Sequence, residues 1–480
     1  MKKITCNLRR LVFPAIFFFS VAMMTGLMYT DNVSSKAFKV TLKGESPIRP
    51  AEAVSESRRT TAMPVAPQYQ IYDIGIVQTG DTASQGFGVS TGGIAVGRSV
   101  RSGGAQAFTW MPGSGIVGLP NLAGRAFCVS NGANNNGIVA GTCATTLFGT
   151  SRLPVVWQNG AASQLPLPAG ETLGDASDVN ASGVAVGSVN GGSLQRGVVY
   201  SGGNAIVITQ TTSNGSFFVT AFGVNDSGRV VGQGIDPTNA ARNVGIVYDI
   251  GSNSAFEVGA LPGANGALAF AVGNSGFVVG SSMQNQGSGL PFIWSQAGGM
   301  AAIPLASGTT QGSARAVNSA GWVVGNDSGQ FSIPFLYDGT ATYRLADLIP
   351  AGTGWDLSMN TSSSALGISD DNVIVGTGVY NGQVHAYAMV PAANVSLGGR
   401  LLTAGGDGIP NAVVTLSGGN LPAPVIARTG GFGYYNFQGL QSGVTYTITV
   451  STKRYVFAQP TRMITLQTDV SNFDFVAEPQ

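Results

Sequence analysis

The chain has 480 residues, of which 70 are glycine; only 10% are charged, and the formal net charge is +1. This length allows two or three domains, while the sparse charge, without a stripe of Lys or Arg, argues against nucleic-acid binding. With only one histidine, the chain cannot by itself form a histidine-dependent triad or a multi-histidine zinc site.

The first thirty residues are typical of an export signal. A basic start with two lysines and two arginines precedes the apolar run Leu11 to Tyr29. No small-x-small cleavage site follows, and the run is just long enough to span a bilayer. Residues 1–30 are therefore either a cleaved signal peptide or a retained N-terminal anchor, and both place the remainder outside the cytoplasm. Residues 31–69, rich in Ser, Pro and charge, are predicted to be a flexible linker.

Residues 70–392 carry a phrase, Val/Ile-Asn-x-x-Gly-x-Val-x-Gly, that recurs seven times in full or degenerate form. Its clearest copies are Val224 to Gly232 and Val317 to Gly325. The glycines that close the copies lie 44 to 51 residues apart: Gly97, Gly141, Gly187, Gly232, Gly280, Gly325 and Gly376. Short β-branched segments at this period predict four-stranded propeller blades and exclude helical repeats. The fold class expected is all-β, a seven-bladed β-propeller followed by a small C-terminal β-sandwich.

The fourth repeat shows the strands expected in each blade. They span 219–224, 229–234, 244–248 and 255–261, with a turn at Asn225 to Gly228 between the first two. The first turn residue is one that favours turns, in most copies by capping local backbone groups. The last is glycine in six copies and asparagine in the seventh, as a positive φ requires.

The third strand of each repeat ends in a large side chain. These residues are Trp110, Trp157, Tyr200, Tyr248, Trp294, Tyr337 and Met389. Seven equivalent positions favour packing between adjacent blades over a ligand-stacking ring.

The two ends of the repeat region predict how it closes. The seventh repeat has no fourth strand after His385 to Pro391, while an orphan apolar segment, Tyr69 to Val77, stands before the first repeat. We expect this segment to complete the last blade, which would also hide sheet edges that could template aggregation.

Residues 71–391 resemble the HAF-type extracellular repeat proteins, which are named for a His-Ala-Phe strand. The matching residues are Ala316 to Gly325, Leu348 to Trp355, and the strands His385-Ala386-Tyr387 and Gln106-Ala107-Phe108. The resemblance implies secretion and a propeller-like fold, and it implies no defined activity. Because the histidine is missing from six of seven copies, His385 is expected to be an ordinary strand residue.

Residues 393–480 resemble carboxypeptidase regulatory-like domains, which are small prealbumin-type β-sandwiches. The matching segments are Ser396 to Leu401, Gly408 to Leu416, Gly433 to Phe437 and Gly443 to Val450. Read without the resemblance, the alternating strands and Gly/Asn/Ser turns also predict a sandwich. The fold family is grouped with carbohydrate-binding-like sandwiches, which implies sugar binding as one role and a structural spacer as the other.

No catalytic, cofactor or metal site is predicted. Asp226, Asp370 and Asp371 lie in repeat turns, where aspartate caps the backbone. A calcium site at the last two would lack the ladder of oxygen ligands that a dedicated loop supplies.

Cys128 and Cys143 lie on the two arms of the first hairpin in the second repeat. Pairing Ala133 with Ile138 around the turn places the two cysteines opposite each other. Facing residues of an antiparallel pair approach closely enough for a disulfide, which export permits.

The function expected is that of a non-enzymatic exported protein that binds or scaffolds at the cell surface or outside the cell. Its ligand would be an extracellular carbohydrate or protein, with no nucleic acid, and with membrane contact only through the N-terminal anchor. The variable stretches Gln233 to Arg242 and Ser281 to Leu290 are the expected contact surfaces. One alternative is a propeller-based enzyme acting on polysaccharide, which two carboxylates in the central cleft would favour. Another is an adhesion or matrix protein that acts through the C-terminal sandwich.

Overall fold

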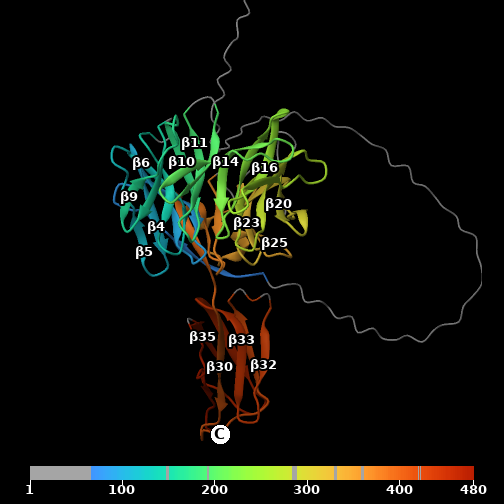
Figure 1. Ribbon diagram of the computed structural model, residues 1–480. Helices are drawn as coiled ribbons and strands as arrows, with labels where there is room; N and C mark the ends of the chain where they lie inside the picture. The colour runs from blue at the N-terminus through green and yellow to red at the C-terminus, as the bar shows by residue number, and fades with distance from the viewer. Residues whose placement is uncertain are drawn as a thin grey trace, which may run out of the picture. The chain divides into compact units, whose positions relative to one another are not determined.

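The computed structural model describes residues 66–479 apart from 147–150, 192–193, 284–288, 307, 329–331, 358–361, 420, 422 and 467. The described part is all-β, with a single short 3-10 helix, η1 (Leu345–Leu348) (Figure 1). No helix in it is long and apolar enough to cross a membrane. The expected signal peptide or anchor, and the linker up to residue 65, lie outside the described residues.

The first two repeats form one eight-stranded sheet. Its strands are β2 (Ala83–Val89), β3 (Ala95–Arg101), β4 (Gly104–Met111), β5 (Gly115–Gly118), β6 (Phe127–Ala133), β7 (Val139–Ala144), β8 (Leu153–Gln158) and β9 (Ala161–Gln164). Within each repeat, consecutive strands pair antiparallel, and one parallel pair, Ala105 with Phe127, joins the two repeats.

Each of the next four repeats forms a four-stranded antiparallel sheet in chain order. The third and fourth repeats hold β10 (Leu173–Val179), β11 (Ala185–Asn190), β12 (Arg196–Ser201), β13 (Asn204–Val207), β14 (Phe217–Val224), β15 (Arg229–Asp236), β16 (Asn239–Asp249) and β17 (Ser254–Glu257). The fifth and sixth hold β18 (Gly266–Val272), β19 (Val278–Met283), β20 (Gly289–Ser295), β21 (Gly299–Ala302), β22 (Gln311–Val317), β23 (Val323–Ser328), β24 (Ser332–Tyr337) and β25 (Thr342–Arg344).

The four strands predicted for the fourth repeat are confirmed as β14 to β17, with one correction. The stretch Gln233 to Arg242, expected to be a variable loop, consists mostly of strand, because β15 and β16 extend until Asp236 pairs with Asn239. Only two residues separate these strands, so the hairpin is tight. The second expected contact stretch also begins and ends in strands, β19 and β20, and its residues 284–288 lie outside the described part.

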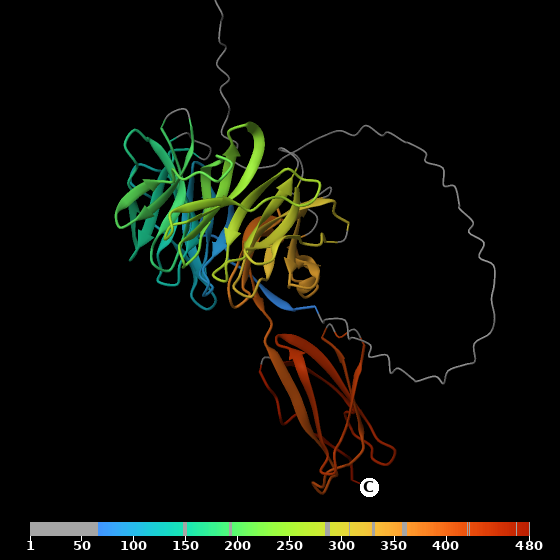
Figure 2. The ribbon, with the colours of Figure 1, turned by 45° about the vertical axis from the view of Figure 1, so that its right-hand side comes forward.

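The seventh repeat is completed by the strand that precedes the first repeat, as predicted. Its own strands are β26 (Trp355–Asp356), β27 (Ser364–Ile368), β28 (Ile374–Tyr380) and β29 (Gln383–Pro391). Strand β1 (Tyr69–Asp73) pairs antiparallel with β29, from Tyr69 opposite Pro391 to Asp73 opposite Tyr387; Figure 2 shows this blue segment beside the orange strands of the last repeat. His385, expected to be an ordinary strand residue, adds a side-chain contact to this pairing, since its Nδ1 lies 2.9 Å from Asp73 Oδ1.

The large side chains at the ends of the third strands pack between neighbouring repeats, which confirms their predicted role. Trp157 of the second repeat is buried against Val96 and Ala107 of the first. Tyr248 of the fourth repeat is buried with Val186 and Val199 of the third. The repeats therefore share hydrophobic cores, and no repeat buries its apolar face alone.

The C-terminal region forms two sheets of its own. Its strands are β30 (Asn394–Leu402), β31 (Val413–Gly418), β32 (Val425–Arg428), β33 (Tyr434–Gln441), β34 (Val444–Ser451), β35 (Thr461–Leu466) and β36 (Phe475–Val476). One sheet has the order β33-β30-β36 and the other β32-β31-β34-β35. Leu397 and Leu401 of the first sheet share one hydrophobic core with Val414, Leu416 and Ile448 of the second.

Cys128 and Cys143 face each other across β6 and β7 and form a disulfide. The register assumed at the turn was wrong by one residue, because Ala133 pairs with Val139 rather than with Ile138. A β-bulge at Asn131 shifts the register back, so the two cysteines still come opposite each other.

We expect thiol titration of the unreduced exported protein to find neither of these cysteines free. Reduction should destabilise the protein by about 3 kcal/mol, the chain-entropy value for a loop of this size, since the two cysteines lie 15 residues apart. Denaturant unfolding with and without reductant measures the difference. Two free thiols in the unreduced sample would contradict the bond.

Candidate functional site

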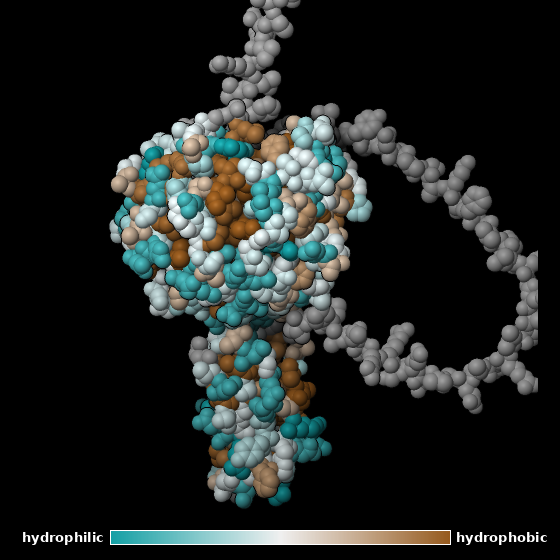
Figure 3. Space-filling view, in the orientation of Figure 1, coloured by the Kyte–Doolittle hydropathy of each residue, from teal (hydrophilic) through white to brown (hydrophobic). Residues whose placement is uncertain are grey.

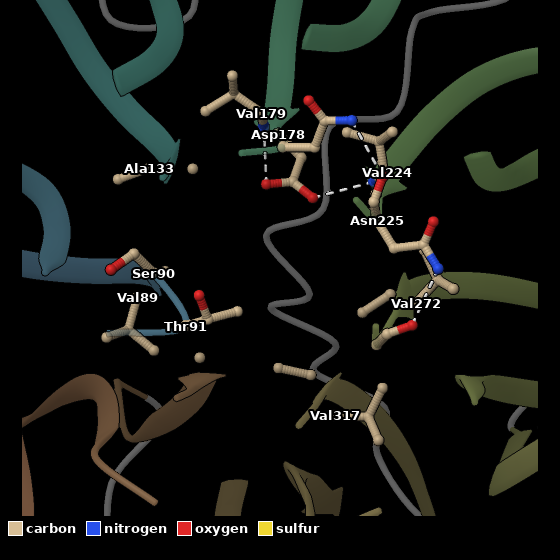
Figure 4. Close-up of a pocket in the computed structure, with 18 of the residues that line it drawn as sticks. Val89, Ser90, Thr91, Ala133, Asp178, Val179, Val224, Asn225, Val272 and Val317 are labelled. Carbon is tan, nitrogen blue, oxygen red and sulfur yellow. Dashed lines mark hydrogen bonds between the residues drawn. The ribbon is translucent and has the colours of Figure 1, made fainter. Parts of the chain in front are cut away.

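The first strands of all seven repeats line one shared pocket with a volume of about 280 Å³ (Figure 4). Each of these strands carries a β-bulge at the same place, three residues before the first turn residue. A bulge inserts one unpaired residue and re-aims its side chain. The seven bulge residues all line the pocket: Phe87, Asn131, Ser177, Phe222, Phe270, Arg315 and Leu366.

Small residues flank each bulge because the first strands of neighbouring repeats approach one another closely. A Cβ atom added at Gly132 would lie 2.6 Å from Asp178 Oδ1, and one added at Gly367 would lie 2.8 Å from Val89 N. The residue after the bulge is accordingly glycine or alanine in six repeats and Asp178 in the third. The backbone around the pocket is thus uniform, while the side chains that enter it differ.

The bulge side chains divide the pocket into an apolar and a polar part. The rings of Phe222 and Phe270 have centroids 5.6 Å apart, and the Arg315 guanidinium lies 4.3 Å from the centroid of Phe270. Leu366 and Phe87, from the repeats that follow, extend the apolar part. Asn131, Ser177 and Asp178 supply the polar part.

Asp178 is the pocket carboxylate whose ionisation the structure perturbs most. Its two oxygens accept hydrogen bonds from the backbone N–H groups of Val179, at 2.8 Å, and of Val224 in the next repeat, at 3.0 Å (Figure 4). Burial raises the pKa of Asp178 to about 6; the two N–H donors oppose this shift, and the charge of Asp226 adds to it. The group therefore titrates close to neutral pH.

We expect the contribution of Asp178 to the stability of the protein to fall as the pH rises from about 4 to about 6. The pKa of Asp178 is raised from 3.8 in the unfolded chain to about 6, so the folded state binds more protons in this interval. One such group changes the unfolding free energy by at most about 1.4 kcal/mol per pH unit.

Denaturant unfolding at several pH values measures this slope. Asp178→Ala, which introduces the residue found at this place in the fifth and sixth repeats, should flatten it. Asp327, whose pKa burial also raises to about 6, should maintain the remainder. An identical slope in the variant would contradict the assignment.

The turn residues at the mouth of the pocket connect adjacent repeats. Asn134, Asn180 and Asn225 each accept local backbone N–H groups through Oδ1, which confirms the predicted capping. Each also donates from Nδ2 to the backbone carbonyl of the equivalent turn residue in the next repeat, at 2.8 to 3.1 Å. The hydrogen bond from Nδ2 links neighbouring repeats. It explains why asparagine recurs at a position where serine could also cap the local backbone N–H groups.

Asp226 and Asp370 accept hydrogen bonds from backbone N–H groups, as predicted, but these N–H groups belong to the preceding repeat. Asp226 accepts from Ala181 N and Asp370 from Ser319 N, each at 2.8 Å. Asp371 is exposed. In the described part of the chain no three His, Cys, Asp or Glu side chains are grouped so as to hold a metal ion.

Among the described residues, none from Gln233 to Arg242 or from Ser281 to Leu290, the two stretches expected to contact a ligand, lines the pocket. Neither His385 nor the buried disulfide lines it. Sequence reasoning missed the bulge residues. One signal was available, since a single variable residue sits between small ones shortly before each turn, as Phe222 does between Ala221 and Gly223.

No family model matches the chain, and no curated protein matches it. Among solved structures, virginiamycin B lyase from Staphylococcus aureus is 10% identical, with a TM-score of 0.44 over 67% of this chain and 99% of that one. YCF48 bound to D1 peptide is 13% identical, with a TM-score of 0.41 over 69% and 99%. Oligogalacturonate lyase from Vibrio parahaemolyticus is 10% identical, with a TM-score of 0.41 over 67% and 97%. These neighbours are β-propeller proteins, and the likeness concerns the fold alone.

Proposed function

We propose that the repeat region is a seven-bladed β-propeller whose central pocket binds an extracellular ligand. The protein would be an exported, non-enzymatic binding or scaffolding protein of the HAF-repeat type, and carbohydrate is the ligand class to test first. The pairing of β1 with β29 supports a closed ring, and the pocket shared by all seven first strands supports a central site.

The observation that carries this proposal is the contrast between a constant backbone and variable side chains. The bulge recurs in every repeat, yet its side chain is aromatic, aliphatic, amide, hydroxyl or guanidinium. Side chains that only filled space would be expected to be alike in equivalent positions. A concave, partly apolar pocket with a few convergent polar groups is the usual form of a ligand site.

The hydrogen bonds of the pocket carboxylates favour binding over catalysis. Asp178, Asp226 and Asp370 each accept hydrogen bonds from protein groups through both oxygens. An enzyme acting on polysaccharide is the second candidate, and the raised pKa of Asp178 beside the charge of Asp226 is the observation in its favour. In that case Asp178 would serve as the acid.

For the C-terminal region we propose a sandwich of the carboxypeptidase regulatory-like type that acts as a spacer. Adhesion through this region is the alternative. Several large apolar side chains are exposed on it, among them Ile426, Phe432, Tyr434 and Met463, and Figure 3 shows brown apolar groups among its polar surface.

A glycan-array screen of the exported protein tests the central proposal. We expect retention on a defined set of glycans, lost in Phe222→Ala and preserved after truncation at Pro391. Retention that survives Phe222→Ala would place the ligand elsewhere. Loss on truncation would favour the adhesion alternative, and cleavage of a retained glycan that depends on Asp178 would favour the enzyme.

A further inference from the structure

Arg315 lines the pocket and is a cation without a polar partner among the described residues. Its Nε is buried and has no hydrogen-bond partner among the described residues, and its one ring contact is with Phe270. Arg98, which also lies over a phenylalanine, donates to Gln85 Oε1 at 2.8 Å. Arg242 forms ion pairs with Asp236 and Glu257. Arg315 therefore differs from Arg98 and Arg242, since it forms no hydrogen bond or ion pair with a described residue.

Such an arrangement is unfavourable unless a ligand completes it. Burying a charge without a partner costs free energy, and buried charges in proteins are normally paired. Burial lowers the pKa of Arg315 to about 10, so the guanidinium stays charged at neutral pH. An ionisable group with a shifted pKa in a cleft is a candidate for a functional site.

The surroundings of Arg315 favour a singly charged, planar anion. Guanidinium binds carboxylate through two parallel hydrogen bonds in one plane. Three aspartates also line the pocket, Asp178, Asp226 and Asp370, and they would repel a doubly charged phosphate more strongly than a carboxylate. The volume of about 280 Å³ lies at the lower end of the range for small-molecule sites, so it suits a small molecule or one terminal group.

We propose that Arg315 anchors the carboxylate of a ligand whose apolar face lies against Phe222 and Phe270. Asn131 and Ser177, on the polar part of the pocket, would bind its hydroxyl or carbonyl groups. This inference rests on the proposed function, because it names the ligand class of the same pocket. An aryl acid and a uronic acid both present this chemistry.

Isothermal titration calorimetry of the exported protein with two matched pairs of probes tests whether the pocket binds a carboxylate. The first pair is 3-phenylpropionate and its neutral amide, and the second is methyl glucuronoside and methyl glucoside. We expect the acid of at least one pair to bind about tenfold more tightly than its neutral partner, as a charge-assisted pair provides. A preference in the first pair identifies an aryl acid, and one in the second identifies a uronic acid.

Variants of Arg315 test the binding of a carboxylate separately from the proposed ligand-binding function of the pocket. Arg315→Gln should abolish the preference with only a small loss of stability, because the guanidinium has no polar partner among the described residues and loses only its contact with Phe270, while Arg315→Lys should retain part of the preference. Arg98→Gln removes an arginine that lies over Phe87 but does not line the pocket itself, so it is the control and should keep the preference for the acid. Equal binding of acid and neutral probes, a preference that survives in Arg315→Gln, or no binding of either acid would overturn the proposal. If a glycan found in the array screen still depends on Phe222 but not on Arg315, the pocket function stands and the carboxylate proposal falls.

Discussion

Replacing Gly232 with alanine is expected to destabilise the protein by about 3 kcal/mol, the upper part of the usual range for overpacking. The Cβ atom of alanine would overlap the backbone carbonyl oxygen of Thr220 on the neighbouring strand and would lie 3.0 Å from the Cα of Ala221. Because the obstacle is backbone inside a paired sheet, no side-chain rotation relieves it. Either β14 or β15 has to move.

The same obstacle recurs at every glycine that closes the repeated phrase. A Cβ atom would overlap a backbone carbonyl oxygen of the paired first strand at Gly97, Gly141, Gly187, Gly232, Gly280, Gly325 and Gly376. None of the seven has a positive φ, so close approach, and not backbone conformation, requires glycine there. The bulge and the closing glycine thus occur together, since the bulge lies beside this glycine in each pair of strands.

Gly251→Ala, in the turn between β16 and β17 of the same repeat, is the control. A Cβ atom there would meet only Asp249 Oδ1, at 3.4 Å, which is an ordinary contact, so we expect a change within about 0.5 kcal/mol. Denaturant unfolding of the wild-type protein and the two variants gives the comparison. Similar stability of Gly232→Ala and Gly251→Ala would contradict the steric explanation.

Features that depend on local chemistry were predicted well from the sequence. Asn225 begins the turn of the fourth repeat by capping local N–H groups, and Gly228 ends it with a φ of +81°. Both follow from properties of single residue types. The pairing of β1 with β29 followed from counting strands. The seventh repeat had one strand too few, and the strand-like segment before the first repeat belonged to no other repeat.

The bulges were missed because they leave almost no trace in the pattern of apolar residues. In Ala221-Phe222-Gly223-Val224 the inserted residue is itself apolar, so it does not disturb the apparent alternation. The error is visible at Ala133, which was paired with Ile138 although it pairs with Val139. Since the bulge residues form the pocket, missing the bulges meant missing the candidate site.

The stretch Gln233 to Arg242 was chosen as a contact surface because its composition is polar and varies between repeats. In the structure its polar groups bond to one another and to neighbours. Arg242 forms ion pairs with Asp236, at 3.0 Å, and with Glu257, at 2.7 Å. Composition does not distinguish side chains that are available to a ligand from those that stabilise a long hairpin, and only the contacts show which is which.

A variant of the exported protein that begins at Gly75, and so lacks β1, is expected to lose most of its stability. Tyr69 is fully buried, and Ile74 is 3% exposed. Removing two such side chains costs about 5 to 10 kcal/mol, which is comparable to the whole stability of a typical domain. The deletion also leaves β29 with an unpaired edge, which favours aggregation. Thermal unfolding and light scattering measure both effects, and a synthetic peptide of residues 66–74 added in excess should reverse them.

Point variants of Tyr69 separate strand pairing from side-chain burial. The hydroxyl group of Tyr69 is buried without a hydrogen-bond partner among the described residues, so Tyr69→Phe should be neutral or stabilise the protein by about 1 kcal/mol. Tyr69→Ala should destabilise it by about 3 to 5 kcal/mol, while Tyr72→Ala, at a position 40% exposed, should have little effect. We therefore expect Tyr69→Phe to be at least as stable as the wild-type protein, Tyr69→Ala to be less stable, and the truncated chain to be the least stable. A truncated protein as stable as the wild type would show that the last repeat does not depend on its pairing with β1.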